Sequence, residues 1–274
     1  MQKSTQPKNK RPQESHNQHR KSFPEIASEV ISGSDIIVEV LDARFWKETR
    51  NLELEKEIKK KDKKIIYVFN KSDLADHKKI IVEMGEDVLY PYVFLSCVNR
   101  KGSFDLRERI KIESGKIDKE RIYVGVIGYP NTGKSSVINL LRGKSVARVA
   151  SESGFTKGVQ KIKIGKNVYL IDTPGVIPST EDSKIKKTDL LKHTKINVVR
   201  WDRLKEPEMI VHSLMIQYPG LLEEYYGIEA DGNSEILIVE LGSKKNFFLK
   251  GKEIDIDRTS RLIIRDFQDG RIRF

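Results

Sequence analysis

The stretch GYPNTGKSS, residues 128 to 136, decides the fold. It has the spacing G-x-x-x-x-G-K-S, follows the apolar stretch RIYVGVIG (121–128) and precedes a helical pattern of apolar residues. In this arrangement successive backbone N–H groups and the helix N-terminus bind phosphate groups. We expect Lys134 to neutralise the β- and γ-phosphates and Ser135 to ligate Mg²⁺. The cradle is expected to be completed by Asn131, Thr132, Gly133 and Ser136.

Two further sequence patterns indicate which base is bound. NKSD starts at Asn70 after one strand-like apolar stretch, and SCV starts at Ser96 after the next. The carboxylate of Asp73 can accept hydrogen bonds from N1–H and the exocyclic amino group of guanine, whereas adenine lacks this pair of donors. We expect Asn70 to contact the far edge of the base and to buttress the phosphate loop, while the stem of Lys71 covers the ring. Because a backbone N–H near Cys97 can donate to guanine O6, the two patterns together predict a guanine site.

The stretch IDTPG (171–175) predicts the side of the site that faces the γ-phosphate. It ends an expected β-hairpin over residues 159–172. Asp172 is placed to hold Mg²⁺ through water, and the backbone N–H of Gly175 is placed to meet the γ-phosphate. Alone, DTPG would only indicate a turn. Behind a phosphate loop and a buried strand, it predicts a functional carboxylate.

Strands and helices alternate through most of the chain, which predicts a mainly parallel, doubly wound sheet of the α/β class. The hairpin is expected to add one antiparallel edge strand. The expected strands are 35–43, 63–70, 92–96 and 121–128, and the expected helices are 51–60, 77–85, 105–112 and one from the phosphate loop to about Leu141.

After about residue 178 helical patterns replace strand-like ones. We therefore expect a basic flexible arm over 1–24, a nucleotide-binding domain over 25–178, and a smaller, mainly α-helical domain over 179–274. The expected C-terminal helices are 205–218, 234–242 with Ser234 as the cap and Gly242 as the end, and 257–270 with Asp257 as the cap and Gly270 as the stop.

The charge of the chain favours a polyanionic partner. Lysines and arginines number 51 against 40 acidic residues, which gives a net charge of +11. Arg258, Arg261 and Arg265 have i, i+3, i+7 spacing, so they share a helix face that can follow phosphates, although such a face is more often only solvated. The nearby aromatic residues are expected in the core: Phe247, Phe248 and Phe267.

Composition also limits the class of protein. A single cysteine, Cys97, excludes an internal disulfide and a cysteine-based zinc site. The sequence has no apolar run long enough for a membrane span and no apolar signal segment, so we expect a cytoplasmic protein without a membrane partner.

The base-recognition stretches NKSD (G4 in GTPase nomenclature) and SCV (G5) precede the phosphate loop (G1). The stretch around Thr156 (G2) and IDTPG (G3) follow it, so the motif order is G4–G5–G1–G2–G3. This order resembles the circularly permuted P-loop GTPases of the YlqF/YawG type, which assist ribosome assembly. DARFWKETRN (42–51) resembles the DARxP…RN signature of that family, with Trp46 where proline is usual. SGFTKGVQ (153–160) resembles its switch I, and residues 248–272 resemble its C-terminal segment.

The resemblance implies GTP and GDP as ligands and slow GTP hydrolysis that a partner stimulates. It implies catalytic roles for Lys134, Thr156 and Gly175, and a Mg²⁺ site formed by Ser135, Thr156 and Asp172. Val176 stands where Ras-like proteins have the glutamine that orients water. Asn131 resembles the asparagine with which some such GTPases hold K⁺, and a loop-stabilising role is the equal alternative.

Taken with this resemblance, the sequence predicts a GTPase, monomeric in solution, that binds ribosomal RNA and the precursor of the large subunit and leaves on hydrolysis. Because the segment after Gly175 leads directly into the helical domain, we expect nucleotide state to set the orientation of that domain. The alternative is a structural RNA-binding assembly factor that uses GTP for affinity and rarely hydrolyses it. A small-molecule kinase with a phosphate loop is disfavoured by NKSD and SCV.

Overall fold

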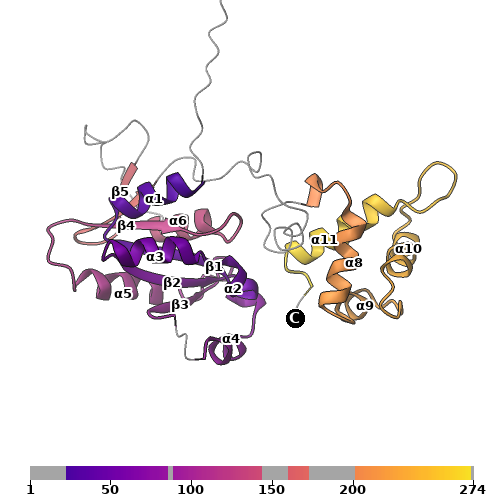
Figure 1. Cartoon of the computed structure of the whole chain (residues 1–274), viewed down its shortest axis with the longest axis horizontal. Coiled ribbons are helices and arrows are strands. Elements are labelled where there is room, and N and C mark those ends of the chain that lie inside the picture. The colour runs from indigo at the N-terminus through magenta and orange to yellow at the C-terminus, as the bar shows by residue number, and fades with distance from the viewer. Residues whose placement is uncertain (1–22, 86–88, 144–159, 173–200, 273–274) are drawn as a thin grey trace, which may run out of the picture.

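The computed structural model describes residues 23–85, 89–143, 160–172 and 201–272 (Figure 1). They form a six-stranded sheet flanked by helices, followed by a cluster of helices. The strands are β1 (Ile36–Asp42), β2 (Lys64–Asn70), β3 (Tyr92–Leu95), β4 (Ile122–Ile127), β5 (Gln160–Lys163) and β6 (Val168–Asp172). The helices of the sheet domain are α1 (Phe23–Gly33), α2 (Trp46–Thr49), α3 (Leu52–Lys60), α4 (His77–Met84), α5 (Ser103–Ser114) and α6 (Lys134–Arg142).

The strand order is β3-β2-β1-β4-β6-β5. All neighbours are parallel except β5, which pairs antiparallel with β6 at the edge. This confirms the predicted doubly wound sheet and its antiparallel edge strand. The register aligns Asp42 with Asn70 and Asn70 with Leu95, so three strands end at one edge. In open α/β sheets ligands bind outside this carboxyl edge.

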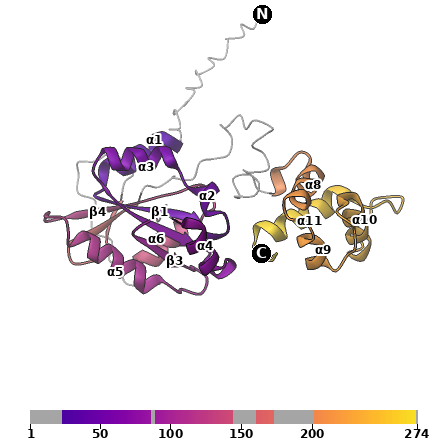
Figure 2. The ribbon, with the colours of Figure 1, turned by 60° about the horizontal axis from the view of Figure 1, so that its bottom comes forward.

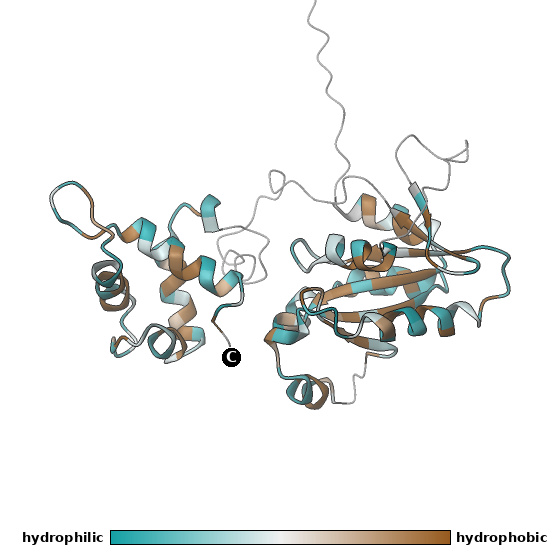
Figure 3. Ribbon diagram, turned by 180° about the vertical axis from the view of Figure 1, so that it is seen from behind, coloured by the Kyte–Doolittle hydropathy of each residue, from teal (hydrophilic) through white to brown (hydrophobic). Residues whose placement is uncertain are grey.

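Helices cover both faces of the sheet (Figures 1 and 3). Strand β1 is buried along its whole length and packs on both sides. Ile36, Val38 and Val40 lie in the core formed with α5 and α6, whereas Ile37 lies in the core formed with α1 and α3. This continuous apolar run is the sequence pattern of a central parallel strand.

Helix α1 was not predicted from the sequence. Its apolar residues Ala27, Val30 and Ile31 are buried against the sheet, with i, i+3, i+4 spacing that is typical of a helix face. Its close approach to β4 depends on Gly125, because a Cβ there would lie 2.4 Å from the Ser34 hydroxyl oxygen and 2.6 Å from Val30 Cγ1.

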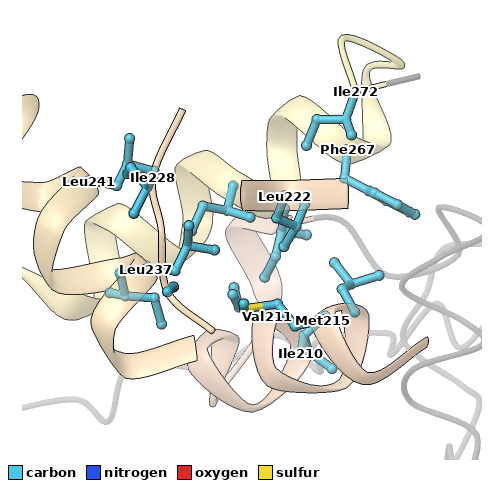
Figure 4. Close-up of a cluster of buried hydrophobic side chains, with 14 of the residues drawn as sticks. Ile210, Val211, Met215, Leu222, Ile228, Leu237, Leu241, Phe267 and Ile272 are labelled. Carbon is cyan, nitrogen blue, oxygen red and sulfur yellow. The ribbon is translucent and has the colours of Figure 1, made fainter. Parts of the chain in front are cut away.

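Among the described residues 201–272, four helices form a cluster: α8 (Pro207–Gln217), α9 (Leu221–Tyr226), α10 (Ser234–Lys244) and α11 (Ile256–Gln268). Their apolar faces share one core, which Figure 4 shows. In Figures 1 and 2 the cluster lies at the end of the molecule where α2 and α4 lie. Phe45, which follows β1, also belongs to this core. No helix in the described ranges combines the length and apolar composition needed to cross a membrane. Of the expected arm over 1–24, residues 1–22 lie outside the described residues, whereas Phe23 and Pro24 begin α1, so the arm was predicted two residues too long. The expected boundary near residue 178 also lies outside the described residues.

Several predicted helix ends are wrong by one or two residues. Asn233, not Ser234, caps α10, since its side chain accepts hydrogen bonds from the N–H groups of Glu235 and Ile236. Asp255, not Asp257, caps α11 by accepting from Arg258 N. The helix α10 also continues past Gly242. A Cβ there would lie 2.5 Å from Ile254 Cγ2, so this glycine serves close packing and does not end the helix.

The three arginines of the expected basic face of α11 contact other residues of this chain. Arg261 donates to the backbone oxygens of Trp201 (2.7 Å) and Leu204 (2.9 Å). The guanidinium of Arg258 lies 3.9 Å from the centre of the Phe247 ring, and Arg265 lies 5.7 Å from that of Trp201. Phe267 is buried as predicted, but Phe247 is only half-buried and Phe248 is 45% exposed, so these two predictions are wrong. Both lie in the segment after α10, where Phe248 bridges to Ile254 and the Phe247 ring contacts Arg258.

We predict that Gly125→Val lowers the free energy of unfolding by about 1–3 kcal/mol, because the added methyl groups force α1 away from β4. Urea unfolding measures the change. Gly33→Ala is the control, since a Cβ at Gly33 meets only Ile171 Cδ1, at 3.5 Å. Equal stability of the Gly125→Val variant and the wild-type protein would contradict the close approach of α1.

A buried carboxyl group in β1 generates a second prediction. Glu39 is 1% exposed, and its Oε1 accepts from the Asn51 N–H at 3.0 Å. Its Oε2 is buried and has no hydrogen-bond partner among the described residues. Burial raises the pKa of Glu39 from 4.5 to about 8, so the folded protein holds this group protonated at neutral pH. The neighbouring Glu55 instead pairs with Arg50 at 2.8 Å.

Because the unfolded chain releases the Glu39 proton near pH 4.5 and the folded chain near pH 8, stability falls as the pH rises between these values. We expect Glu39→Gln to be more stable than wild type by about 1–3 kcal/mol at pH 8 and equal to it near pH 4.5. Urea unfolding across this pH range measures the difference. Glu55→Gln, which breaks an ion pair, should instead be destabilising. A difference for Glu39→Gln that does not depend on pH would refute the titration.

Candidate nucleotide-binding site

The phosphate loop runs from the end of β4 to the start of α6. Gly128 and Gly133 have φ values of 144° and 98°, which favour glycine. A Cβ on Gly133 would lie 2.1 Å from Asn70 Nδ2, and one on Gly128 would lie 2.4 Å from the Val40 carbonyl oxygen. The loop therefore needs both glycines for its conformation and for its fit against the neighbouring strands.

Lys134 begins α6 and is 9% exposed. Its ammonium group donates to the Tyr129 carbonyl oxygen at 2.6 Å, and no described carboxylate pairs with it. Burial lowers the pKa of Lys134 to about 8. A buried cation whose partner is a backbone carbonyl fits an anionic ligand, because a phosphate would supply the missing negative charge. The loop thus has the chemistry that a nucleotide phosphate requires.

Asn70 joins the end of β2 to the phosphate loop. Its Nδ2 donates to the Thr132 carbonyl oxygen at 2.7 Å, so the predicted buttress is present. Its Oδ1 is buried and has no partner among the described residues. The predicted contact of Asn70 with a base stays a prediction.

The other base-recognition residues meet at the same edge. Asp73 lies in a short 3-10 helix (Ser72–Leu74) directly after β2, and Cys97 follows β3. Burial raises the pKa of Cys97 to about 11, with a further contribution from the charge of Asp73, so the group is a neutral thiol beside a carboxylate. The Ser96 hydroxyl accepts from the Asn99 N–H at 3.2 Å. Ser96 thus shapes its loop with its side chain, a role that the sequence analysis did not assign.

Lys71 is held by a partner that the sequence analysis did not foresee. Its ammonium nitrogen lies 2.7 Å from Asp42 Oδ2, and Arg44 binds the same carboxylate through Nε and Nη2 at 3.0 and 2.8 Å. Burial alone would raise the pKa of Asp42, but the charges and hydrogen bonds of Arg44 and Lys71 hold it below its ordinary value. Arg44 also donates from Nη1 to the Phe267 carbonyl oxygen at 3.1 Å, which connects this group to α11.

The phosphate loop and the loops after β2 and β3 surround a cavity of about 640 Å³. Both the base-recognition loops and the phosphate loop line it, together with residues at the end of the helical cluster. Its lining residues are Asn70, Lys71, Asp73, Leu74, Cys97, Val98, Asn131, Gly133, Ser136, Trp201, Gln268 and Asp269. Seven of these twelve residues were predicted from the sequence. Five were not: Leu74 and Val98, which adjoin predicted residues, and Trp201, Gln268 and Asp269, which come from segments far along the chain.

The predicted Mg²⁺ site is only partly within the described residues. Ser135 is exposed in the first turn of α6, and Asp172 ends β6, although only the backbone of Asp172 is described. Thr156 and Gly175 lie outside the described residues. Ser135 therefore fits a metal ligand by position, and the rest of the metal site stays a prediction.

Comparisons with known proteins agree with this architecture. Residues 123–229 match the model of the 50S ribosome-binding GTPase family. The GNP-bound crystal structure of YlqF from T. maritima superposes with a TM-score of 0.66 and 23% identity, over 91% of this chain and 94% of that one. Its GDP-bound structure gives a TM-score of 0.63. At this identity the likeness concerns the fold.

Sequence relatives come from archaea and eukaryotes. The chain is 38% identical over 251 residues to the uncharacterized GTP-binding protein MJ1464 of Methanocaldococcus jannaschii, covering 91% of this chain and 65% of the relative. It is 35% identical over 250 residues to nucleolar GTP-binding protein 2 of Saccharomyces cerevisiae, covering 89% of this chain and 50% of the relative. The chain thus spans about two thirds of the archaeal relative and half of the yeast one. The strand order and the phosphate loop agree with these matches: the chain has the P-loop GTPase fold of YlqF, and it is similar in sequence to GTP-binding proteins of archaea and eukaryotes.

Proposed function

We propose that the protein binds guanine nucleotides in the cavity at the carboxyl edge of the sheet and hydrolyses GTP there. The observation that carries this proposal is the convergence of Asp73, Cys97 and the phosphate loop on one cavity. The base would lie between the loops after β2 and β3, and the phosphates would lie against the N-terminus of α6. The carboxylate of Asp73 would select guanine through N1–H and the amino group.

Hydrolysis would use Lys134 to stabilise the charge on the transferred phosphate, with Thr156 and Gly175 around the γ-phosphate. Mg²⁺, when bound, neutralises charge between the β- and γ-phosphates, and Ser135, Thr156 and Asp172 are the residues that would hold it. Asn131 is the candidate residue for K⁺. It has a positive φ of 61° in the phosphate loop and lines the cavity, which fits either a cation ligand or a loop-stabilising side chain.

For the partner, we propose ribosomal RNA in a precursor of the large ribosomal subunit. Support comes from the net charge of +11, from the 50S ribosome-binding description of the matching family and from the nucleolar relatives. Hydrolysis would time release, and nucleotide state would set the orientation of the helical cluster. A cytoplasmic location and a monomeric state stay predictions. The alternative is a structural RNA-binding factor that uses GTP for affinity with little turnover.

Base specificity gives the first test. Asp73→Asn should weaken GDP binding roughly 10- to 100-fold, because it replaces an acceptor with an amide donor opposite the guanine amino group. The same change should strengthen binding of xanthosine diphosphate, whose O2 accepts from the new amide. Calorimetry with both nucleotides measures this exchange. Asp105→Asn, an exposed carboxylate on α5, is the matched control, and equal losses for both bases would argue against Asp73 as the base-reading residue.

Turnover with ribosomal particles separates the proposed function from its alternative. We expect GTP hydrolysis in K⁺ buffer to rise with isolated large subunits and not with small subunits, and Lys134→Ala to abolish the rise. Replacing K⁺ by Na⁺ tests the role of Asn131, since equal rates would exclude K⁺ activation. Tight GTP binding without stimulation by either particle would favour the structural RNA-binding factor.

A further inference from the structure

One wall of the nucleotide cavity comes from the helical cluster. Trp201, Gln268 and Asp269 line it together with the phosphate loop, although they follow that loop by at least 65 residues. Trp201 belongs to a short 3-10 helix (Trp201–Arg203), and Gln268 and Asp269 end α11. The nucleotide-binding motifs of the sheet domain do not predict that residues of the helical cluster line the cavity.

The end of α11 is fixed against the sheet domain by three separate contacts. Arg44, oriented by Asp42, donates to the Phe267 carbonyl oxygen at 3.1 Å. The rings of Phe45 and Phe267 stack with centroids 5.9 Å apart. Gly270 lies so close to Leu74 that a Cβ would approach Leu74 Cδ1 to 2.3 Å. Leu74 itself lines the cavity one residue after Asp73, so this contact joins α11 directly to the base-recognition loop.

The wall is also held from within the helical cluster. The backbone N–H of Trp201 donates to Gln268 Oε1 at 3.2 Å, so two of these three cavity residues are joined by a hydrogen bond. The side chain of Asp269 is 49% exposed, and Arg271 Nη2 lies 3.7 Å from its Oδ2. The charge of Asp269 also acts on Lys71, where it offsets part of the burial that lowers the pKa of that lysine. Asp269 therefore presents a loosely paired carboxylate to the cavity.

The chemistry of a guanine nucleotide limits what this carboxylate can bind. An ionised carboxylate only accepts hydrogen bonds, and phosphate groups repel it. The donors of a guanine nucleotide are N1–H, the exocyclic amino group and the ribose hydroxyls. Asp73 takes the first two in the proposed binding mode, so the ribose hydroxyls are the donors that remain for a second carboxylate.

We propose that the C-terminal end of α11 completes the nucleotide site, with Asp269 accepting a hydrogen bond from a ribose hydroxyl. This inference rests on the proposed function and extends it to the helical cluster. The bound nucleotide then contacts both parts of the chain, so its binding and the docking of α11 stabilise each other.

Affinities for GDP and for 2′,3′-dideoxy-GDP test the proposal on the full chain, by calorimetry. The Asp269→Ala variant should bind GDP roughly 5- to 30-fold more weakly than wild type, as expected for loss of a charge-assisted hydrogen bond. It should bind 2′,3′-dideoxy-GDP as well as wild type does, because that ligand lacks the donor. Glu240→Ala removes an exposed carboxylate from α10 and should change neither affinity.

Two further measurements separate direct contact from a general loss of structure. Arg44→Lys keeps the positive charge but cannot donate to Asp42 and Phe267 together, so it should weaken GDP binding and keep the unfolding transition cooperative. The emission of Trp201 should change when GDP binds, in wild type and in a Trp46→Phe variant, since the chain has only two tryptophans.

The outcomes are distinct for the two proposals. If wild type binds GDP and Asp269→Ala binds both nucleotides as wild type does, the role of α11 is refuted and the guanine site stands. Equal losses for GDP and the dideoxy nucleotide would also refute the ribose contact. If wild type binds no guanine nucleotide, the proposed function fails, and the inference fails with it.

Discussion

The buried carboxylate of Asp42 is the interaction on which the arrangement of the site depends. It is 2% exposed and binds two cations, Arg44 and Lys71. Removing one partner of such a buried group costs about 3–5 kcal/mol, because the remaining charges are left without compensation. Here one carboxylate sets the position of the lysine that is expected to cover the base and of the arginine that reaches α11. The base-recognition loop and the helical cluster are thereby positioned by the same group.

Asp42 can connect these parts because the ends of β1 and β2 and the phosphate loop meet at one edge of the sheet. Strand β1 ends at Asp42 beside the end of β2, and Asn70 there buttresses the phosphate loop through the Thr132 carbonyl. The loops after β1 and β2 and the phosphate loop after β4 are therefore neighbours, because parallel strands end at one edge of the sheet whatever their order along the chain. The helical cluster is joined to the sheet domain covalently after β6 and non-covalently through Arg44 and Phe45. Two connections constrain the cluster more than the linker alone would.

The sequence predicted the elements that have strong local signals. Each expected strand is present, and Asn51 caps α3 as expected, with Leu54 and Ile58 buried. Trp46 stands where the YlqF/YawG signature usually has proline. It begins α2 and packs edge-on against Phe69, so this aromatic contact fixes the loop after β1.

What the sequence could not predict depends on contacts between distant residues. Arg44 and Phe267 lie 223 positions apart, and no periodicity or turn signal relates them. Helix caps differed because Asn233 and Asp255 compete with acceptable caps one or two residues away. Gly242 resembles a helix stop in sequence, and only the packing of Ile254 against it shows why a small residue is needed inside a helix.

A site built from both parts of the chain has a thermodynamic consequence. If a nucleotide favours the docked position of α11, then docking must favour the nucleotide by the same factor. An RNA partner that pulls on the helical cluster would then weaken nucleotide binding, and one that holds the cluster in place would strengthen it. The partner would act through Arg44 and Asp42 on the base side of the site, away from the γ-phosphate. Such a route differs from a switch at the segment after β6, because it responds to GDP and GTP alike.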